Sequence, residues 1–359
     1  MTQSPQNNTG FARLRRLFGR LWTRPDSDFG PVRGPQTHLV ILDGTMSSLN
    51  RGYETNAGLT YLLAQEMGSQ ISIYYEPGLQ WNDWRSFHAV ASGRGINRQI
   101  KRAYGYLASR YRQGDRIYLI GYSRGAYAVR SLAGIIDRVG LLARADATER
   151  NIRQAYRLYE KASSGPAVQA FKARHCRGEV PIEMIGVWDT VKSLGINAPI
   201  FWRLSVARYA FHNHELGKGV KRGCHALALD ETRVMYRPVL WTSDPARPEQ
   251  ISQMWFRGSH GDVGGQLGGR HFARPLSNVP LVWMLEQAQA AGLPLPQGWQ
   301  ARFPQDATAP SIGMWAGWAR LAVTRRKRVV GADPSEQVHP SVQTPTADTP
   351  PPAIATIRS

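Results

Sequence analysis

The sequence predicts an α/β fold in which a mostly parallel, doubly wound sheet carries helices on both faces. Short apolar runs alternate with longer segments of helical character along most of the chain. These runs are nearly continuous in apolar residues, which is typical of strands buried on both faces of a parallel sheet. With 359 residues, of which 42% are hydrophobic, the chain can form one large domain with appendages or two small domains.

The first half of the chain supplies three of the expected strands. An apolar run predicts a strand at 38–42, and it ends in Asp43-Gly44-Thr45. A helix is expected over 57–67, and the β-branched and aromatic run at 71–75 predicts the next strand. A helix over 96–111 precedes a strand at 116–121, which is followed by a helix from Ala126 to Val139.

In the second half, residues 146–176 are charged and of helical character. An apolar strand is expected from Ile182 to Trp188, and the last strands are expected at 239–241 and 251–256. A helix is expected from Asn278 to Ala291. Residues 196–222 are rich in aromatic, histidine and arginine residues, and we interpret them as a segment that could cap a site as a lid.

Both ends are expected to be appendages to a domain at 37–318. Residues 1–36 are interpreted as a basic amphipathic segment and a linker. Apolar residues lie there at helical spacing, with arginines elsewhere on the wheel: Phe11, Leu14, Leu17, Phe18, Leu21 and Trp22. This pattern is typical of a helix at a membrane interface, and docking on the domain or on a cognate protein is an equal alternative. Residues 319–359 hold a basic run and a Pro/Thr/Ala-rich tail, which we expect to be disordered.

The charge of the chain favours an anionic partner. Forty-five Lys and Arg residues against 26 Asp and Glu give a net charge of +19. A phospholipid surface is favoured over nucleic acid, because the sequence holds no nucleic-acid-binding motif; an arginine-rich proteome explains the charge equally well. Cys176 and Cys224 form no Cys-x-x-Cys pattern, so neither a metal site nor another cofactor is expected. The chain also lacks a signal peptide and any run of about 18 apolar residues. We therefore expect a cytoplasmic protein, with membrane association or export by a signal-less route left open.

Gly121-Tyr122-Ser123-Arg124-Gly125 is the most informative motif. It lies between an expected strand and an expected helix, where Gly-x-Ser-x-Gly forms a nucleophile elbow. Glycines allow the close backbone contacts of this turn, and the helix N-terminus favours developing negative charge. An ordinary strand-to-helix turn with a small buried residue is the alternative interpretation.

A serine nucleophile needs a base, and the base needs an acid to orient it. Hydrolases with this elbow carry the three in the order Ser, Asp or Glu, His. Ser123, Asp189 and His260 follow that order, each after an expected strand. The competing acids are Asp230, Asp244 and Asp262, and the competing bases are His212, His214, His225 and His271. Each of the three could instead have a structural role.

The amide of Arg124 is the first expected donor of an oxyanion hole, because it follows the nucleophile. The second donor is expected in the loop after the first strand, from Gly44 or Thr45. Asp43 is expected to hold the geometry of that loop.

Five blocks of sequence occur in a characteristic order: Leu42-Asp43-Gly44-Thr45, Gly121-Tyr122-Ser123-Arg124-Gly125-Ala126, Gly186-Val187-Trp188-Asp189-Thr190-Val191, Ala226-Leu227-Ala228-Leu229-Asp230-Glu231 with Arg233, and Trp255-Phe256 with His260, Asp262, Val263, Gly264 and Gly265. Over roughly residues 38–292 the chain thereby resembles an α/β-hydrolase domain family, long catalogued as uncharacterised, that includes the catalytic domains of type VI secretion phospholipase effectors. The resemblance implies an α/β-hydrolase-like fold and a lipolytic site with Ser123, Asp189 and His260 as its triad. Effectors of that family act on bacterial phospholipids as phospholipases A.

Two other functions stay open at this point. A metal-dependent phosphoesterase could use Asp43, His260 and Asp262 as ligands, since Asp and His suit hydrolytic metals. A non-catalytic scaffold could bind a membrane or a protein through its arginine-rich ends, and Ser123 would then be dispensable.

Overall fold

A computed structural model describes residues 33–78, 94–161, 165–191, 215–313 and 324–342. The chain divides into two units, Met1–Gly34 and Pro35–Ser359, and every helix and strand described below belongs to the second unit. The amphipathic helix expected at 11–22 lies outside the described residues.

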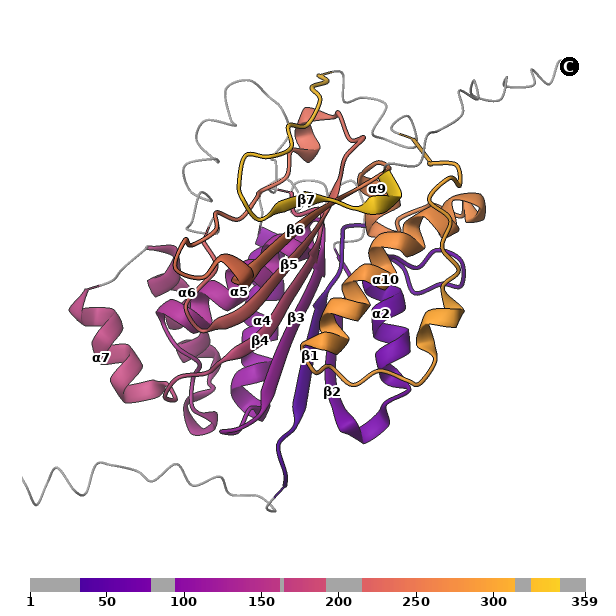
Figure 1. The fold of residues 1–359 in the computed structure, drawn as a ribbon. Helices are drawn as coiled ribbons and strands as arrows, with labels where there is room; N and C mark the ends of the chain where they lie inside the picture. The colour runs from indigo at the N-terminus through magenta and orange to yellow at the C-terminus, as the bar shows by residue number, and fades with distance from the viewer. Residues whose placement is uncertain (1–32, 79–93, 162–164, 192–214, 314–323, 343–359) are drawn as a thin grey trace, which may run out of the picture. The chain divides into compact units, whose positions relative to one another are not determined.

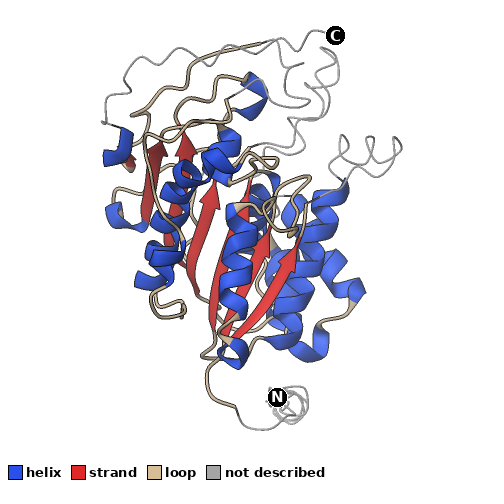
Figure 2. Cartoon of the chain, turned by 90° about the vertical axis from the view of Figure 1, so that its right-hand side faces the viewer, coloured by secondary structure: helices blue, strands red, loops and turns tan. Residues whose placement is uncertain are grey.

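A seven-stranded parallel sheet forms the centre of this unit (Figure 2). Its strands are β1 (Thr37–Leu42), β2 (Ile71–Glu76), β3 (Arg116–Tyr122), β4 (Ile182–Trp188), β5 (Val220–Ala228), β6 (Ile251–Phe256) and β7 (Glu336–Val338). The strand order is β2-β1-β3-β4-β5-β6-β7, and all six pairings are parallel. At the carboxyl ends, Tyr122 of β3 is in register with Trp188 of β4, and Ala228 of β5 with Phe256 of β6. The α/β fold is therefore as predicted.

Helices cover both faces of the sheet (Figure 1). One layer holds α4 (Arg94–Arg110), α5 (Arg124–Arg138), α6 (Glu149–Glu160) and α7 (Pro166–His175), and the other holds α2 (Asn56–Gln65) and α10 (Arg274–Ala290). A short helix, α9 (His260–Gly264), follows β6. Single 3₁₀ turns lie at Gly68–Gln70, Arg144–Asp146, Val234–Tyr236, Pro248–Gln250, His271–Ala273, Trp299–Arg302 and Pro340–Val342.

The pleat of the strands separates two hydrophobic cores. Val40 and Leu42 of β1 pack in the core beneath α4 and α5, whereas Leu39 and Ile41 pack in the core beneath α2 and α10. Successive side chains of a strand point to opposite faces, so a strand between two helical layers needs apolar residues at every position. This explains why the run at 38–42 is continuous. None of the helices in the described ranges is both long and apolar enough to cross a membrane.

The sequence interpretation was wrong for two segments near the site. β5 was not expected, and it begins inside the proposed lid 196–222; the lid residues up to 214 lie outside the described residues. Residues 239–241, expected as a strand, form no strand. There, the N–H of Val239 donates to the carbonyl of Thr190 (2.9 Å), and the Val239 carbonyl accepts from the Arg130 guanidinium. These contacts satisfy the backbone of this apolar run without a neighbouring strand.

The expected disorder of 319–359 is also contradicted, for residues 324–342. β7 pairs with β6, the N–H of Gln253 donates to the carbonyl of Ser335 (3.0 Å), and the indole of Trp255 donates to Glu336 (2.7 Å). This segment is held by polar contacts with β6 rather than by apolar burial of its own, so its composition gave no sign of order. Residues 343–359 lie outside the described part of the chain.

Candidate active site

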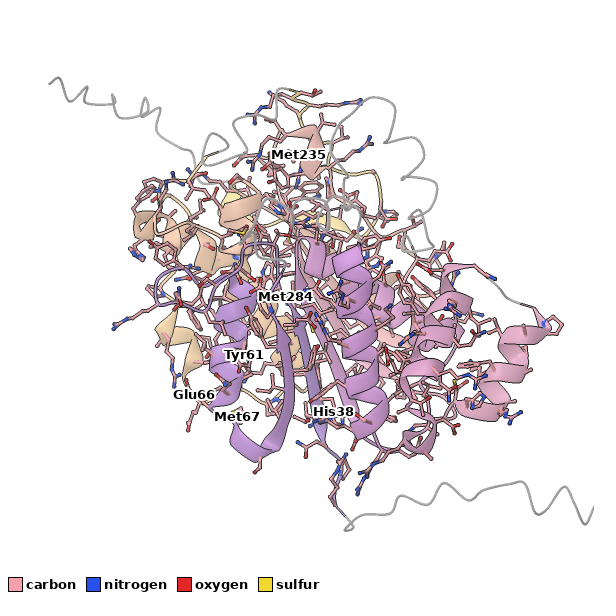
Figure 3. All side chains as sticks on the ribbon, turned by 180° about the vertical axis from the view of Figure 1, so that it is seen from behind. His38, Tyr61, Glu66, Met67, Met235 and Met284 are labelled. Atoms are coloured by element: carbon pink, nitrogen blue, oxygen red, sulfur yellow. The ribbon has the colours of Figure 1, made fainter. Side chains whose placement is uncertain are left out.

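The candidate site residues lie where the parallel strands end. Among the described residues, three other than glycine have positive φ, namely Met46 (60°), Ser123 (56°) and Asp189 (40°). They follow β1, β3 and β4 respectively. Strained backbone of this kind persists where surrounding contacts hold it, and it is concentrated at functional sites. Figure 3 shows His38, at the start of β1, at the opposite end of the sheet from Met235.

Ser123 occupies the sharp turn between β3 and α5, with φ 56° and ψ −118°. Its two flanking glycines make this turn possible: a Cβ at Gly121 would lie 2.7 Å from the carbonyl oxygen of Gly125, and a Cβ at Gly125 would lie 2.0 Å from the carbonyl oxygen of Leu42. The N–H of Ser123 donates to the carbonyl of Trp188 (3.0 Å), which fixes the turn against β4. The predicted elbow is thus present as a structural element.

The three residues singled out from the sequence are brought together in a hydrogen-bonded chain. The Oγ of Ser123 lies 2.9 Å from Nε2 of His260, and Nδ1 of His260 lies 2.6 Å from Oδ2 of Asp189. All three residues are buried. With Nδ1–H donated to the carboxylate, the lone pair of Nε2 faces the serine hydroxyl and can accept its proton.

The orientation of His260 is fixed from several sides. Its ring stacks on Tyr122 at a centroid distance of 5.0 Å and on Tyr236 at 4.5 Å. Its backbone N–H donates to Glu231 (3.1 Å) at the start of α9. The imidazole therefore has little freedom to leave the line between Ser123 and Asp189.

Asp189 is a fully buried carboxylate with a cationic partner that the sequence interpretation missed. Its oxygens accept hydrogen bonds from the Ala228 N–H (3.2 Å), from His260, and from both terminal nitrogens of Arg328 (2.6 and 3.0 Å). Burial alone would raise the pKa of Asp189, but Arg328 and then His260 outweigh it and hold the pKa below its usual value. The only sign of Arg328 in the sequence was a basic run within an expected disordered tail.

Arg124, the first expected oxyanion donor, is the first residue of α5. Ser123 precedes α5, so the amide of Arg124 lies at the N-terminus of a helix, where four N–H groups lack intrahelical partners. A Cβ built at Gly44 would lie 3.5 Å from the Cβ of Ser123, so the loop after β1 adjoins the nucleophile. The amide of Gly44 itself donates to Asp43 (2.6 Å), contrary to the expectation that it could serve as a donor. Thr45 is then the candidate in this loop, and its carbonyl is held by Gln266 (2.8 Å).

Comparison with known proteins identifies the family of this fold and site. Residues 36–287 match the family described as "T6SS, Phospholipase effector Tle1-like, catalytic domain". The chain belongs to this family.

Individual relatives of this family member are distant. It is 28% identical over 244 residues to the uncharacterized protein YEL023C of Saccharomyces cerevisiae, a match that covers 60% of this chain and 34% of the relative. Among solved structures, an uncharacterized protein from Pseudomonas aeruginosa aligns with TM-score 0.41 and 16% identity, over 81% of this chain and 50% of the other. The Tle1 effector, solved bound to the VgrG spike of the type VI secretion system, aligns with TM-score 0.31 and 15% identity, over 66% and 52%. The chain thus spans about a third to a half of the length of these proteins.

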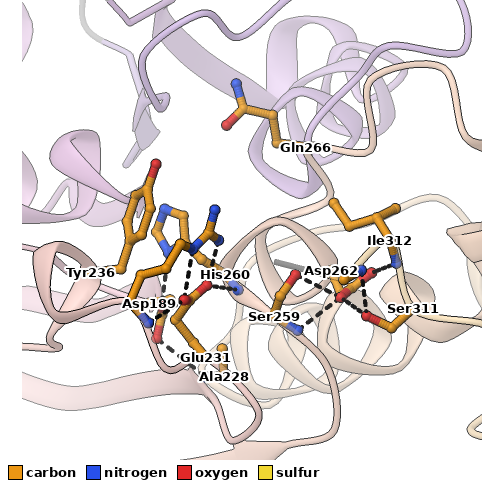
Figure 4. Close-up of polar contacts among 12 residues, drawn as sticks. Asp189, Ala228, Glu231, Tyr236, Ser259, His260, Asp262, Gln266, Ser311 and Ile312 are labelled. Atoms are coloured by element: carbon orange, nitrogen blue, oxygen red, sulfur yellow. Dashed lines mark hydrogen bonds and ion pairs between the residues drawn. The ribbon is translucent and has the colours of Figure 1, made fainter. Parts of the chain in front are cut away.

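The two other carboxylates of the predicted site have structural contacts in this Tle1-like domain. Asp43 accepts hydrogen bonds from Thr55 (2.6 Å) and Tyr75 (2.9 Å), and burial raises the pKa of its carboxyl to about 6. Asp262 caps α9 through Ser259 and also accepts from Ser311 (2.5 Å) and the Ile312 N–H (2.9 Å). Figure 4 shows this second cluster apart from the pair of Asp189 and His260.

The competing acids and bases have other contacts. Asp230 accepts from the N–H of Gly258 (2.6 Å) and Asp244 from that of Ala246 (2.9 Å). His225 accepts from the N–H of Thr190 (3.1 Å), and burial lowers its pKa to about 3. His271 is exposed, and His212 and His214 lie outside the described residues.

Asp43, His260 and Asp262, the metal ligands of the phosphoesterase alternative, are not grouped around one site. The oxygens of Asp43 and Asp262 are engaged in the separate clusters described above. Over the described ranges, no three His, Cys, Asp or Glu side chains are grouped so that they could hold a metal ion.

Proposed function

We propose that this chain is a serine hydrolase that cleaves carboxylic ester bonds of phospholipids, in the manner of a phospholipase A. The observation that supports it most is the chain of hydrogen bonds from Ser123 through His260 to Asp189, at 2.9 and 2.6 Å, on a strained strand-to-helix turn. Membership of the Tle1-like family of phospholipase effector catalytic domains supports the substrate class.

The proposed reaction has two steps. The Oγ of Ser123 attacks the ester carbonyl, its proton passes to Nε2 of His260, and the negative oxygen is stabilised by the amides of Arg124 and Thr45. When the tetrahedral intermediate collapses, His260 gives the proton to the departing alcohol, which leaves the acyl group on Ser123. Water then attacks the acyl-enzyme with His260 as base, which releases a fatty acid and restores the hydroxyl.

The remaining features are assigned as follows. The net charge of +19 supports contact with an anionic membrane surface. The segment 1–36 is proposed to bind either that surface or a cognate protein, and a secretion route without a cleavable signal accords with the family. The catalytic unit is proposed to begin near residue 37.

The test is release of fatty acid from anionic phospholipid vesicles, with a short-chain nitrophenyl ester assayed in parallel. Wild type is compared with Ser123→Ala and with Ser109→Ala, a matched control on α4 whose hydroxyl donates to the carbonyl of Tyr106 and accepts from Arg110. We expect activity on vesicles that disappears in Ser123→Ala, persists in Ser109→Ala and is unaffected by a chelator.

Other results would redirect the assignment. Activity that survives Ser123→Ala but is lost with chelator would indicate metal-dependent hydrolysis. Activity on the short ester alone would retain the serine mechanism and remove the membrane substrate. Inactivity of folded protein on both substrates would favour a binding scaffold.

A further inference from the structure

Arg328 is a buried cation that contacts the acid of the candidate triad. Its side chain is only 6% exposed, and its two terminal nitrogens lie 2.6 and 3.0 Å from the two oxygens of Asp189. The same nitrogens donate to the carbonyl oxygens of Ala228 (2.7 Å) and Tyr236 (2.5 Å). A planar guanidinium bound in this bidentate way fixes the plane of the carboxylate as well as its position.

Each oxygen of the Asp189 carboxylate is shared between two hydrogen-bond donors. Oδ2 of Asp189 accepts from both His260 and Arg328, while Oδ1 accepts from Arg328 and from the N–H of Ala228. The charge of this fully buried carboxylate is thus already matched by a permanent cation before any proton reaches His260. An imidazolium formed at His260 would share its counterion with the guanidinium.

We propose that Arg328 is a positioning residue that fixes the carboxylate of Asp189 for His260 and shares the charge of that carboxylate with an imidazolium at His260, an inference that rests on the proposed function. A cation close to the imidazole opposes its protonation, whereas the carboxylate alone would favour it. Loss of Arg328 would leave the charge of Asp189 to the imidazolium alone.

The other charged and titratable groups around the pair do not replace this effect. Glu231, which accepts from the backbone of His260, is paired with Arg233, so the two charges largely cancel. His225, on β5, is kept neutral by burial. Tyr122 and Tyr236, which stack on His260, have pKa values raised by burial and stay uncharged.

The test measures how fast Ser123 is labelled by an alkyl fluorophosphonate between about pH 5 and pH 9, which span the usual titration of histidine. In this reaction the Ser123 oxygen bonds to phosphorus, fluoride leaves and His260 takes the serine proton, so no lipid is needed. The variants are Arg328→Met, Arg328→Gln and Arg328→Lys. Lys327→Met is the matched control, because it removes an exposed charge from the adjacent position.

Without the cation, the acid limb of the labelling profile is expected to move to higher pH in Arg328→Met and Arg328→Gln. Arg328→Lys keeps the charge but loses the bidentate fork, so its plateau should fall while its acid limb stays in place. Lys327→Met should match wild type. A uniform loss of rate in the neutral variants, with the acid limb unmoved, would show that Arg328 acts on structure alone and would overturn the proposal.

Thermal unfolding of each variant separates this effect from failure to fold. If neither neutral variant folds, Arg328→Lys is the remaining test: an upward shift of its acid limb in spite of the retained charge overturns the proposal. If wild-type Ser123 is not labelled at any pH, the proposed function itself fails and this inference fails with it.

Discussion

Asp43 accepts a 2.6 Å hydrogen bond from the amide of Gly44, the residue that follows it on the loop beside Ser123. The same carboxylate also holds Thr55, the N-cap of α2. One buried acid therefore joins the loop after β1 to the start of the next helix. The shape of this loop depends on a carboxyl group whose charge changes near neutral pH.

The free energy of unfolding should therefore depend on whether Asp43 is protonated. Burial, opposed by hydrogen bonds from Thr55, Gly44 and Tyr75, raises the pKa of Asp43 from 3.8 to about 6. The folded state thus binds this proton more tightly than the unfolded state, so its contribution to stability grows as pH falls from about 6 to about 4. The full contribution is about 3 kcal/mol, because one pKa unit corresponds to about 1.4 kcal/mol.

The measurement is the free energy of unfolding in denaturant at several pH values, for wild type and Asp43→Asn. The advantage of wild type over the variant should increase as pH falls through this range. The control is Asp306→Asn, which removes an exposed acid whose pKa is lowered from 3.8 by Thr308, so the advantage of wild type over this variant should stay nearly constant over this range and decrease only at lower pH. Parallel pH dependences of wild type and Asp43→Asn would contradict the prediction.

Substitution of Asp189 and substitution of Asp262 should have different effects on activity and stability. Asp189→Asn leaves the shape of the side chain but removes the acceptor that orients His260, so kcat should fall by about 10⁴-fold. Asp262→Asn disturbs the cap of α9 and the contacts to Ser311 and Ile312, so it should lower Tm and leave the kcat of the folded enzyme close to wild type. A larger loss of kcat in Asp262→Asn than in Asp189→Asn would reverse the assignment.

The stacking of Tyr236 on His260 predicts a role for its ring. Tyr236→Ala removes one of the two rings that hold the imidazole, and kcat should fall by about 10- to 100-fold as His260 becomes less well positioned. Tyr236→Phe retains the ring and should stay close to wild type. The measurement is kcat of both variants on the short-chain ester. Equal kcat values for Tyr236→Ala and Tyr236→Phe would contradict a positioning role for the ring.

The elbow should tolerate no side chain at its last glycine. In Gly125→Ala the new methyl group would lie 2.0 Å from the carbonyl oxygen of Leu42, so β1 and α5 would have to separate. The free energy of unfolding should fall by about 3 kcal/mol. Gly178→Ala adds the same methyl group where nothing lies within 4 Å and should be nearly neutral. Similar unfolding midpoints for the two variants would contradict this account.

The sequence was informative wherever a structural element is built from neighbouring residues. The runs that became β1, β3, β4 and β6 are apolar because both of their faces are buried, and the elbow needs its glycines at fixed spacing. β5 was missed because Lys221, Arg222 and Gly223 interrupt its apolar pattern; Lys221 reaches Glu183 on β4 instead. Such a cross-strand pair depends on a register that is set only in the folded sheet.

The missed part of the site depends on contacts between distant segments. Arg328 lies 139 positions after Asp189, and no local pattern connects them. Gly44 or Thr45 was expected to donate to an oxyanion. Only the side-chain orientation of Asp43 shows that the amide of Gly44 already donates to that carboxylate. Sequence patterns predicted the site residues Ser123, Asp189 and His260, which are joined by hydrogen bonds in the structure, whereas the contact of Arg328 with Asp189 required the fold.

The order of the strands also bears on how the protein is made. After β2 has paired with one side of β1, the strands β3 to β7 are added to the other side in the order of the chain. Each strand that leaves the ribosome can therefore pair with an edge that already exists. Ser123, Asp189 and His260 all emerge before Arg328, so for a time the buried carboxylate has no guanidinium beside it. The site acquires its final charge balance only when the segment that carries Arg328 has been synthesised and has docked against Asp189.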